Sequence, residues 1–296
     1  MAVDDTVIWN GASTSVYSTA GNYQADGPPA VDDAVIFPDG NTVAVDGSDE
    51  NATALFSFTT KAGYSGTIGA VTAGLPVPLE LAATTFNLGG SGVAVIDLTA
   101  NSTTTCNVSK AAASPGIGQY GLTLSSADTI TNLNIKLANG ESVGVAALAG
   151  QSGTFTNVSI DGAGTVTLGS GLGTIEDLQI DGTGIVYIDC DYTTLTMNGT
   201  PAIYQRSGAG ATLLAQGGRF FNNTIGTIET TSVFPGATVD CTDGPQARAM
   251  TTINVHGDGV FDDSDKKTTW TTLNDYGSGV NIKLGVNKTH TRGAIS

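Results

Sequence analysis

Short alternations of apolar and polar residues recur along the chain, and the clearest pair lies between Thr154 and Ile188. Residues 154–168 and 174–188 each contain an alternation, an Asp-Gly-x-Gly step and a second alternation. A period of two places the apolar side chains on one face of a strand, and Asp-Gly and Gly-x-Gly are typical of turns. Thr174 follows Thr154 by 20 residues. A repeat of this length predicts an all-β fold, a single-stranded β-solenoid, also called a parallel β-helix.

The repeat continues on both sides of this stretch. The first apolar position of each repeat falls at Ile130, Phe155, Ile175, Tyr192 and Met250. The steps are 25, 20, 17 and 58 residues, and the last fits three rungs, with intervening rungs near Thr212-Leu213 and Thr227-Ile228. Unequal steps predict an irregular solenoid with loops of different length. At ~20 residues per turn, we expect on the order of 10–12 rungs between Asn41 and Val286.

The first forty residues differ from the rest and predict a cap. They contain a near-repeat, residues 4–9 and 32–37, separated by Gly-Pro-Pro at 27–29. Terminal repeats of a solenoid are atypical because they must present a finished face. The predicted organisation is an N-terminal cap at 1–40, a β-solenoid body at 41–286 and a C-terminal tail at 287–296.

Large aromatic residues gather at the two predicted ends of the solenoid. They are Trp9, Tyr17, Tyr23, Phe37 and Trp270. One interpretation is that their rings pack inside caps that close the ends. The other is that they contact a partner, since aromatic residues are enriched at protein interfaces.

Three local features refine the expected path of the chain. Residues 41–46 have the pattern of a short strand, and the small, Gly/Pro-containing residues 111–121 that of a loop. Residues 75–79 contain Pro76 and Pro78. Because proline donates no ladder hydrogen bond, we place this segment at a corner or an edge.

Composition agrees with folded β structure and excludes several classes of function. The chain has 40 glycines, 13% charged residues and a formal net charge of −16. An acidic surface repels phosphate backbones, so no nucleic-acid partner is expected. No apolar run is long enough for a membrane helix. The first residues lack the basic segment and apolar core of a secretory signal, so we expect no membrane partner.

The cysteines predict neither a disulfide framework nor a zinc site. Cys106, Cys190 and Cys241 are widely separated, and no Cys-x-x-Cys pair occurs. Cys190 continues the inward phase of Val186 and Ile188, which predicts a buried thiol. Because an aspartate precedes both Cys190 and Cys241, we expect the two to occupy equivalent rung positions.

One outward patch offers candidate chemistry. Alternation after Ile185 places Tyr187, Asp189 and Asp191 on the outside, where an aromatic ring and two carboxylates could hold a carbohydrate or a cation. Two carboxylates at i and i+2 of a strand lie roughly as far apart as the pair of an inverting glycosidase, ~6.5–9.5 Å. The three arginines that a lyase-like site would draw on show no evident register with Asp189; they are Arg206, Arg219 and Arg248. A solvated outer face is the alternative interpretation.

Other catalytic and metal motifs are missing from the sequence. Residues 257–265 are rich in aspartate but lack the order of an EF-hand loop, so an acidic turn is expected. The histidines are His256 and His290, too few for a His-based metal site or a catalytic triad. We therefore expect no enzymatic activity, no cofactor and no metal.

The N-terminal segment resembles the entrance motif of certain β-helical proteins. That motif has Trp, Asn-Trp, Pro and Asp-Val-Phe in order, and here Trp9, Asn22-Tyr23, Pro28-Pro29 and residues 32–37 match it, with Tyr23 where tryptophan is usual. The segments 58–69 and 247–253 and the Thr-Ile-x-x-Leu-x-Ile-x-Gly rungs are similar to later parts of the same proteins. Such proteins occur among the structural genes of tailed bacteriophages and among autotransporter-like bacterial surface proteins.

The phage resemblance implies a virion component, such as a head decoration or cement protein, and carries over no catalytic residues. It implies the major capsid protein or other virion proteins as partners, and a location on the outside of a particle built in the host cytoplasm. The prevalence of closed homo-oligomers adds the hypothesis of a homo-oligomer, for example a trimer. A tail-associated carbohydrate-binding or carbohydrate-cleaving β-helix and a bacterial surface adhesin are the alternatives.

Overall fold

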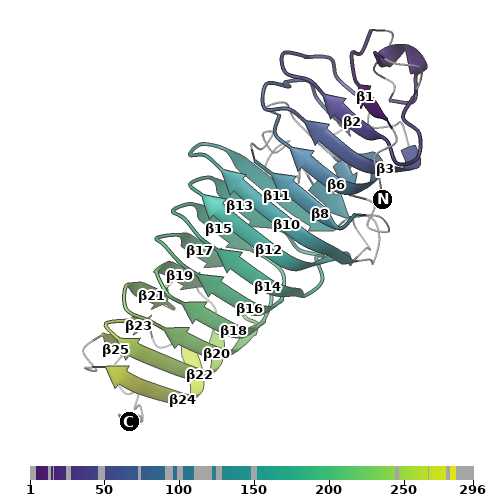
Figure 1. Cartoon of the computed structure of the whole chain (residues 1–296). Coiled ribbons are helices and arrows are strands. Elements are labelled where there is room, and N and C mark those ends of the chain that lie inside the picture. Colours follow the sequence, from purple (N-terminus) through teal and green to yellow (C-terminus); the bar gives the residue numbers. More distant parts are fainter. Residues whose placement is uncertain are drawn as a thin grey trace. The chain divides into compact units, whose positions relative to one another are not determined.

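The computed structural model confirms the predicted fold class: the chain is a β-solenoid of about 10 turns, with 61% of its residues in strands (Figure 1). The structure describes residues 5–12, 15, 17–24, 28–45, 51–72, 75–90, 96–98, 103–109, 122–124, 129–147, 152–243, 247–265, 267–277 and 281–284. The chain divides into two compact units, residues 1–156 and 157–296.

The strands of the first unit pair in parallel, except for β4 and β5. Its elements are β1 (Thr6–Ile8), the 3-10 helix η1 (Ala20–Asn22), β2 (Ala34–Phe37), β3 (Asn51–Thr60), β4 (Ala70–Thr72), β5 (Leu75–Val77), β6 (Leu79–Leu88), β7 (Ile96–Leu98), β8 (Thr105–Val108), β9 (Leu122–Leu124), β10 (Thr129–Leu137) and β11 (Ser142–Ala147). One ladder runs β1-β2-β3-β6-β8-β10 and a second runs β7-β9-β11. Strand β6 joins them, because its first residues pair with β7 and its last residues with β8.

The N-terminal near-repeat forms the first two rungs of that ladder. Val7 lies opposite Val35 in the parallel β1–β2 pair, and Val35 lies opposite Phe58 in the β2–β3 pair. The repeated residues therefore stack in register, as their sequence similarity indicates. Strands β1 and β2 are thus continuous with the ladder that begins the solenoid.

Two of the three local predictions of the chain path can be compared with the structure. Residues 75–77 form β5, which pairs with β4 in a two-stranded antiparallel sheet outside the main ladders, so they lie at an edge, whereas Leu79 begins β6. The strand predicted at 41–46 is wrong: of residues 41–45, only Val45 forms a bridge, to Ile68. The reason is local, because the Asn41 side-chain oxygen accepts the Val43 N–H at 2.9 Å and draws the backbone into a turn. The loop predicted at 111–121 lies outside the described residues.

The second unit is the more regular. Its strands are β12 (Thr154–Gly162, which begins in the first unit), β13 (Thr165–Leu168), β14 (Ile175–Ile180), β15 (Ile185–Ile188), β16 (Tyr192–Met197), β17 (Ala202–Gln205), β18 (Gly210–Ala215), β19 (Gly218–Asn222), β20 (Thr227–Val233), β21 (Ala237–Asp240), β22 (Arg248–Gly257), β23 (Val260–Asp263), β24 (Thr268–Gly277) and β25 (Ile282–Leu284). Even-numbered strands form one parallel ladder and odd-numbered strands the other. Each turn thus contributes one strand to each of two ladders.

Inward side chains of the second unit stack into columns along these ladders. One column contains Leu178, Leu195, Leu213, Thr231, Ile253 and Leu273. The side chains of the four leucines and Ile253 are at most 2% exposed. Burying one such side chain stabilises a fold by roughly 1.5–3 kcal/mol, so a column that repeats at every rung accounts for much of the stability.

The Asp-Gly-x-Gly steps are corners, as predicted. Gly162 and Gly182 have φ values of 103° and 121°, a region that side chains with a Cβ rarely adopt. A Cβ at Gly182 would also lie 2.4 Å from the carbonyl oxygen of Gly162. Glycine is therefore required because the corners of successive rungs stack backbone on backbone.

The rung spacing is largely confirmed. Ile175, Tyr192, Ile228, Met250 and Trp270 share one column, and the two proposed intervening rungs exist. In the first of them the column residue is Gly210, three positions before the expected apolar residue, Leu213, which instead lies opposite Leu195. The Tyr192 ring fills the space, since a Cβ at Gly210 would lie 2.4 Å from it.

We predict that Gly210→Ala lowers the free energy of unfolding by about 1–3 kcal/mol, because it overpacks the core against the Tyr192 ring. Urea denaturation of the wild type, Gly210→Ala, Tyr192→Leu and the double variant measures this as a double-mutant cycle. The free energy of unfolding of the double variant is expected to be higher than the value obtained by adding the two single losses. Strict additivity would show that the Tyr192 ring does not limit the residue at 210.

Candidate functional site

The aromatic residues near the N-terminus form one buried cluster in the first unit. The Trp9 ring centroid lies 5.3 Å from those of Tyr23 and Phe37 and 6.4 Å from that of Tyr17. The Tyr23 hydroxyl donates to the Tyr17 carbonyl oxygen at 2.7 Å. All four side chains are at most 5% exposed. Because these four rings are buried against one another, the structure favours the interpretation that they pack inside a cap over the interpretation that they contact a partner.

Trp270 differs from these four because its side chain is only partly buried. It lies on β24, opposite Met250 of β22, and continues an inward column. Its ring packs edge-on against Phe261 at 6.3 Å. Trp270 thus covers core residues of the last described rungs, and a partly exposed face of its ring leaves the partner-contact interpretation open.

On the outer face of the odd-numbered ladder, Tyr187, Tyr204 and Phe221 stack in register; we call them the aromatic ladder. Their centroids are 5.4 and 4.3 Å apart along the stack. The Arg206 guanidinium lies 4.6 Å from the Tyr187 ring and that of Arg219 lies 4.6 Å from the Phe221 ring. Each contact adds stacking or cation–π stabilisation on the order of 1 kcal/mol.

The two carboxylates of the predicted patch face outward but are already engaged. Arg206 donates from Nε and Nη2 to both carboxylate oxygens of Asp189. Asp191 accepts the Ala209 N–H at 2.7 Å. The expected lack of register between the arginines and Asp189 is wrong, because Arg206 follows Asp189 by the same 17 residues that separate Tyr192 from Ile175. Tyr187 and Asp189 therefore take part in contacts with Arg206 that link neighbouring rungs.

A second arginine, Arg219, contacts the last ring of the aromatic ladder, that of Phe221. Arg219 donates to Asp240, which also accepts the backbone N–H and the hydroxyl of Thr242 at 2.8 and 2.7 Å. Burial alone would raise the pKa of Asp240. The hydrogen bonds from Thr242 and Arg219 and the Arg219 charge outweigh burial and hold that pKa below its usual range.

Arg248, the third of the arginines considered for a lyase-like site, is fully buried. Its Nε donates to the Asn222 carbonyl oxygen at 2.5 Å, its Nη2 donates to that of Asp243, and its Nη1 pairs with Asp265 at 3.2 Å. A buried guanidinium is tolerated only when it is paired and hydrogen-bonded in this way. Arg248 therefore ties together the turns after β19, β21 and β23.

The cysteines are free, buried thiols, as predicted. Burial raises the pKa of Cys106, Cys190 and Cys241 to about 12. The expected equivalence of Cys190 and Cys241 is wrong. Asp240 lies opposite Phe221, so Cys241 follows the Ile188 column, whereas Cys190 lies two residues beyond Ile188.

Residues 257–265, expected to be an acidic turn, contain strand β23, and only the residues beside that strand form turns. Within residues 257–265, Asp262 pairs with Lys283 at 3.1 Å, and Asp265 pairs with Arg248 and with Lys267. His256 is stacked between Phe234 and Tyr276, with centroids at 4.6 and 4.9 Å. His290 lies outside the described residues. Among the described residues, no group of three or more His, Cys, Asp or Glu side chains is placed to hold a metal.

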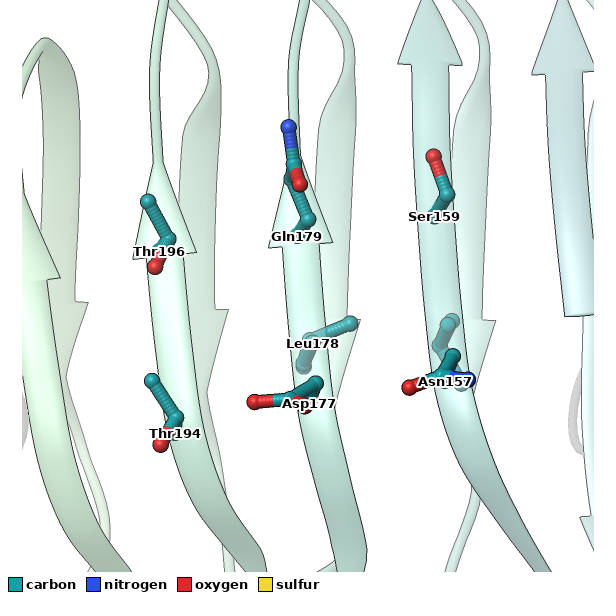
Figure 2. Close-up of a pocket in the computed structure, with 8 residues that line it drawn as sticks. Asn157, Ser159, Asp177, Leu178, Gln179, Thr194 and Thr196 are labelled. Carbon is teal, nitrogen blue, oxygen red and sulfur yellow. The ribbon is translucent and has the colours of Figure 1, made fainter. Parts of the chain in front are cut away.

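A shallow depression of about 340 Å³ lies on the outer face of β12, β14 and β16 (Figure 2). Its outward residues are Asn157, Ser159, Asp177, Gln179, Thr194 and Thr196, and the backbone around Val158 and Leu178 forms its floor. We call it the polar groove. No sequence motif marks it, although alternation and the 20- and 17-residue steps place these polar positions opposite one another.

No protein-family model, no curated protein and no solved structure matches this chain. Within the part of the chain that the structure describes, no helix is long and apolar enough to cross a membrane.

We predict that the three thiols of the native protein do not react with Ellman's reagent at about pH 8, because the thiolate is the reactive form and burial disfavours it. All three are expected to react after denaturation in guanidinium. Ser264→Cys, at an exposed position, serves as a control and should add one rapidly reacting thiol. Rapid labelling of a wild-type thiol in the native protein would contradict the buried placement.

We predict that Asp240→Asn is destabilising at neutral pH and that its effect disappears in acid. Because the folded pKa of Asp240 is lowered, its stabilisation is complete above the unfolded value, ~3.9, and is lost as the pH falls through the folded value. Denaturant unfolding of both proteins between about pH 3 and pH 7 measures the difference. Asp243→Asn, at an exposed position nearby, is the control and should change stability little. If the difference in unfolding free energy between the two proteins stays constant with pH, the charge of Asp240 does not stabilise the fold.

Proposed function

We propose that this protein is a non-enzymatic structural component of a virion and that it decorates or cements the outside of a phage capsid. The observation that carries this proposal is the N-terminal end. The residues that resemble the phage entrance motif, Trp9, Tyr23 and Phe37, form the aromatic cluster that caps the first unit. These residues of the motif thus have a structural role in this chain, which favours a structural protein.

The use made of the charged side chains favours a scaffold over an enzyme. Asp189, Asp240 and Asp265 are each paired with an arginine, and these pairs link neighbouring rungs. A general acid or base must be free to exchange a proton with a substrate. Groups committed to inter-rung pairs instead stabilise the stack of strands, which suits a protein that must persist on a particle.

Charge favours an exterior location. With a net charge of −16 the chain is repelled by packaged DNA and lowers non-specific adhesion between particles. The partner in this proposal is the major capsid protein or another virion protein, met after synthesis in the host cytoplasm. Assembly as a homo-oligomer, for example a trimer at a capsid symmetry axis, belongs to the same proposal.

We predict that an antibody raised against the recombinant chain labels the heads of virus particles purified from the source of this sequence. Immunogold electron microscopy locates the protein, and quantitative mass spectrometry gives its copy number relative to the major capsid protein. A decoration protein should be present at a copy number comparable to that of the capsid lattice sites. Labelling of the tail alone, at a few copies, or of a bacterial surface without particles would overturn the proposal.

A further inference from the structure

The polar groove has one carboxylate, that of Asp177, among the residues that line it. Asp177 is exposed on β14 between Asn157 of β12 and Thr194 of β16, which lie opposite it in the parallel register. Among the described residues, no hydrogen bond or ion pair engages the Asp177 carboxylate. This contrasts with Asp189, Asp240 and Asp265, which are each paired with an arginine.

The neighbouring column supplies further hydrogen-bonding groups. Ser159, Gln179 and Thr196 lie opposite one another across the same strands. The Gln179 side-chain nitrogen donates to Asp181 at 2.6 Å, and Asp181 also accepts from Asn198 at 2.8 Å. The Gln179 amide is therefore held in place before any ligand arrives. Such preorganisation lowers the entropic cost of binding.

We propose that the polar groove binds a neutral polysaccharide that runs across the strands. An ionised carboxylate accepts hydrogen bonds from two adjacent sugar hydroxyls, and charge-assisted bonds of this kind are the stronger ones. The hydroxyls of Ser159 and Thr194 can donate or accept, and the threonine methyl groups offer contacts for the apolar C–H faces of a sugar. Figure 2 shows these side chains on the outer face of three adjacent strands.

The repeat of the ladder matches a linear glycan. Neighbouring strands lie ~4.8 Å apart, which is comparable to the width of one pyranose ring. A glycan lying perpendicular to β12, β14 and β16 therefore presents one sugar to each strand. Each sugar meets two outward residues of its strand, and Asp177 with Gln179 contacts the central sugar.

Two other ligand classes fit the groove poorly. An anionic glycan or phosphate would approach the Asp177 carboxylate on a chain of net charge −16. A calcium ion takes six to eight oxygen ligands, usually with several carboxylates, and Asp177 is the only carboxylate among the residues that line the groove. Tyr187, Asp189 and Asp191 are not among the residues that line the groove. It is independent of the virion location proposed above.

The test uses the full-length chain in affinity electrophoresis through gels that contain dextran, mannan, galactan or, as the anionic comparison, alginate. Titration calorimetry with the retarding polysaccharide then gives the affinity. Asp177→Asn keeps the shape of the groove and removes its charge, and Thr194→Trp fills it. Thr252→Trp is the matched control, because Thr252 lies in the same outward column as Thr194, beyond the groove.

We expect at least one neutral polysaccharide to retard the wild type. Asp177→Asn should weaken binding at least about tenfold, Thr194→Trp should abolish it, and Thr252→Trp should leave it unchanged. Retardation by alginate alone, by no polysaccharide, or equally by wild type and Thr194→Trp would overturn the proposal. So would equal losses in Thr194→Trp and Thr252→Trp, once circular dichroism shows that both are folded. None of these outcomes bears on where the protein lies on a particle.

Discussion

The in-register parallel pairing of strands is the constraint on which the rest of the structure depends. In each ladder of the second unit, a residue lies directly over its counterpart in the preceding turn, at a spacing of ~4.8 Å. Paired residues of successive rungs are therefore neighbours, and the side chain that fits at one position depends on the residue at the other. Inside, the constraint acts on volume, as where Gly210 lies against the large Tyr192 ring. Outside, it acts on charge and ring faces, and it produces the aromatic ladder with an arginine at either end.

The fold class, the rung period and the corners could be predicted because each rests on local chemistry. Alternation sets the buried face of a strand, and Asp-Gly-x-Gly sets the corner, whatever the neighbouring rung contains. The prediction at 41–46 failed for a local reason too: Asn41 bonds its own backbone and competes with the ladder. A pattern of apolar residues carries no information on that competition.

The contacts of the candidate site residues could not be predicted in the same way, because they join residues of different rungs. Alternation within one strand does not show which residues of two rungs lie opposite each other. Tyr187, Asp189 and Asp191 were correctly placed outside, yet whether Asp189 is free depends on Arg206, one turn later. Similarly, an aromatic residue near a chain end is compatible with a surface or a core, and only the packing of Trp9 against Phe37 distinguishes them. The 17-residue step predicts the Asp189–Arg206 pairing when it is applied to outward positions as well as to inward ones.

The aromatic cluster around Trp9 has a consequence for how the protein is made. In the first unit it precedes every later rung in the sequence, so a ribosome delivers the closed end first. Each rung that emerges afterwards finds a completed strand edge on which to pair. The nascent chain thus exposes one templating edge at a time, and the order of synthesis itself limits misregistered pairing between rungs of similar sequence.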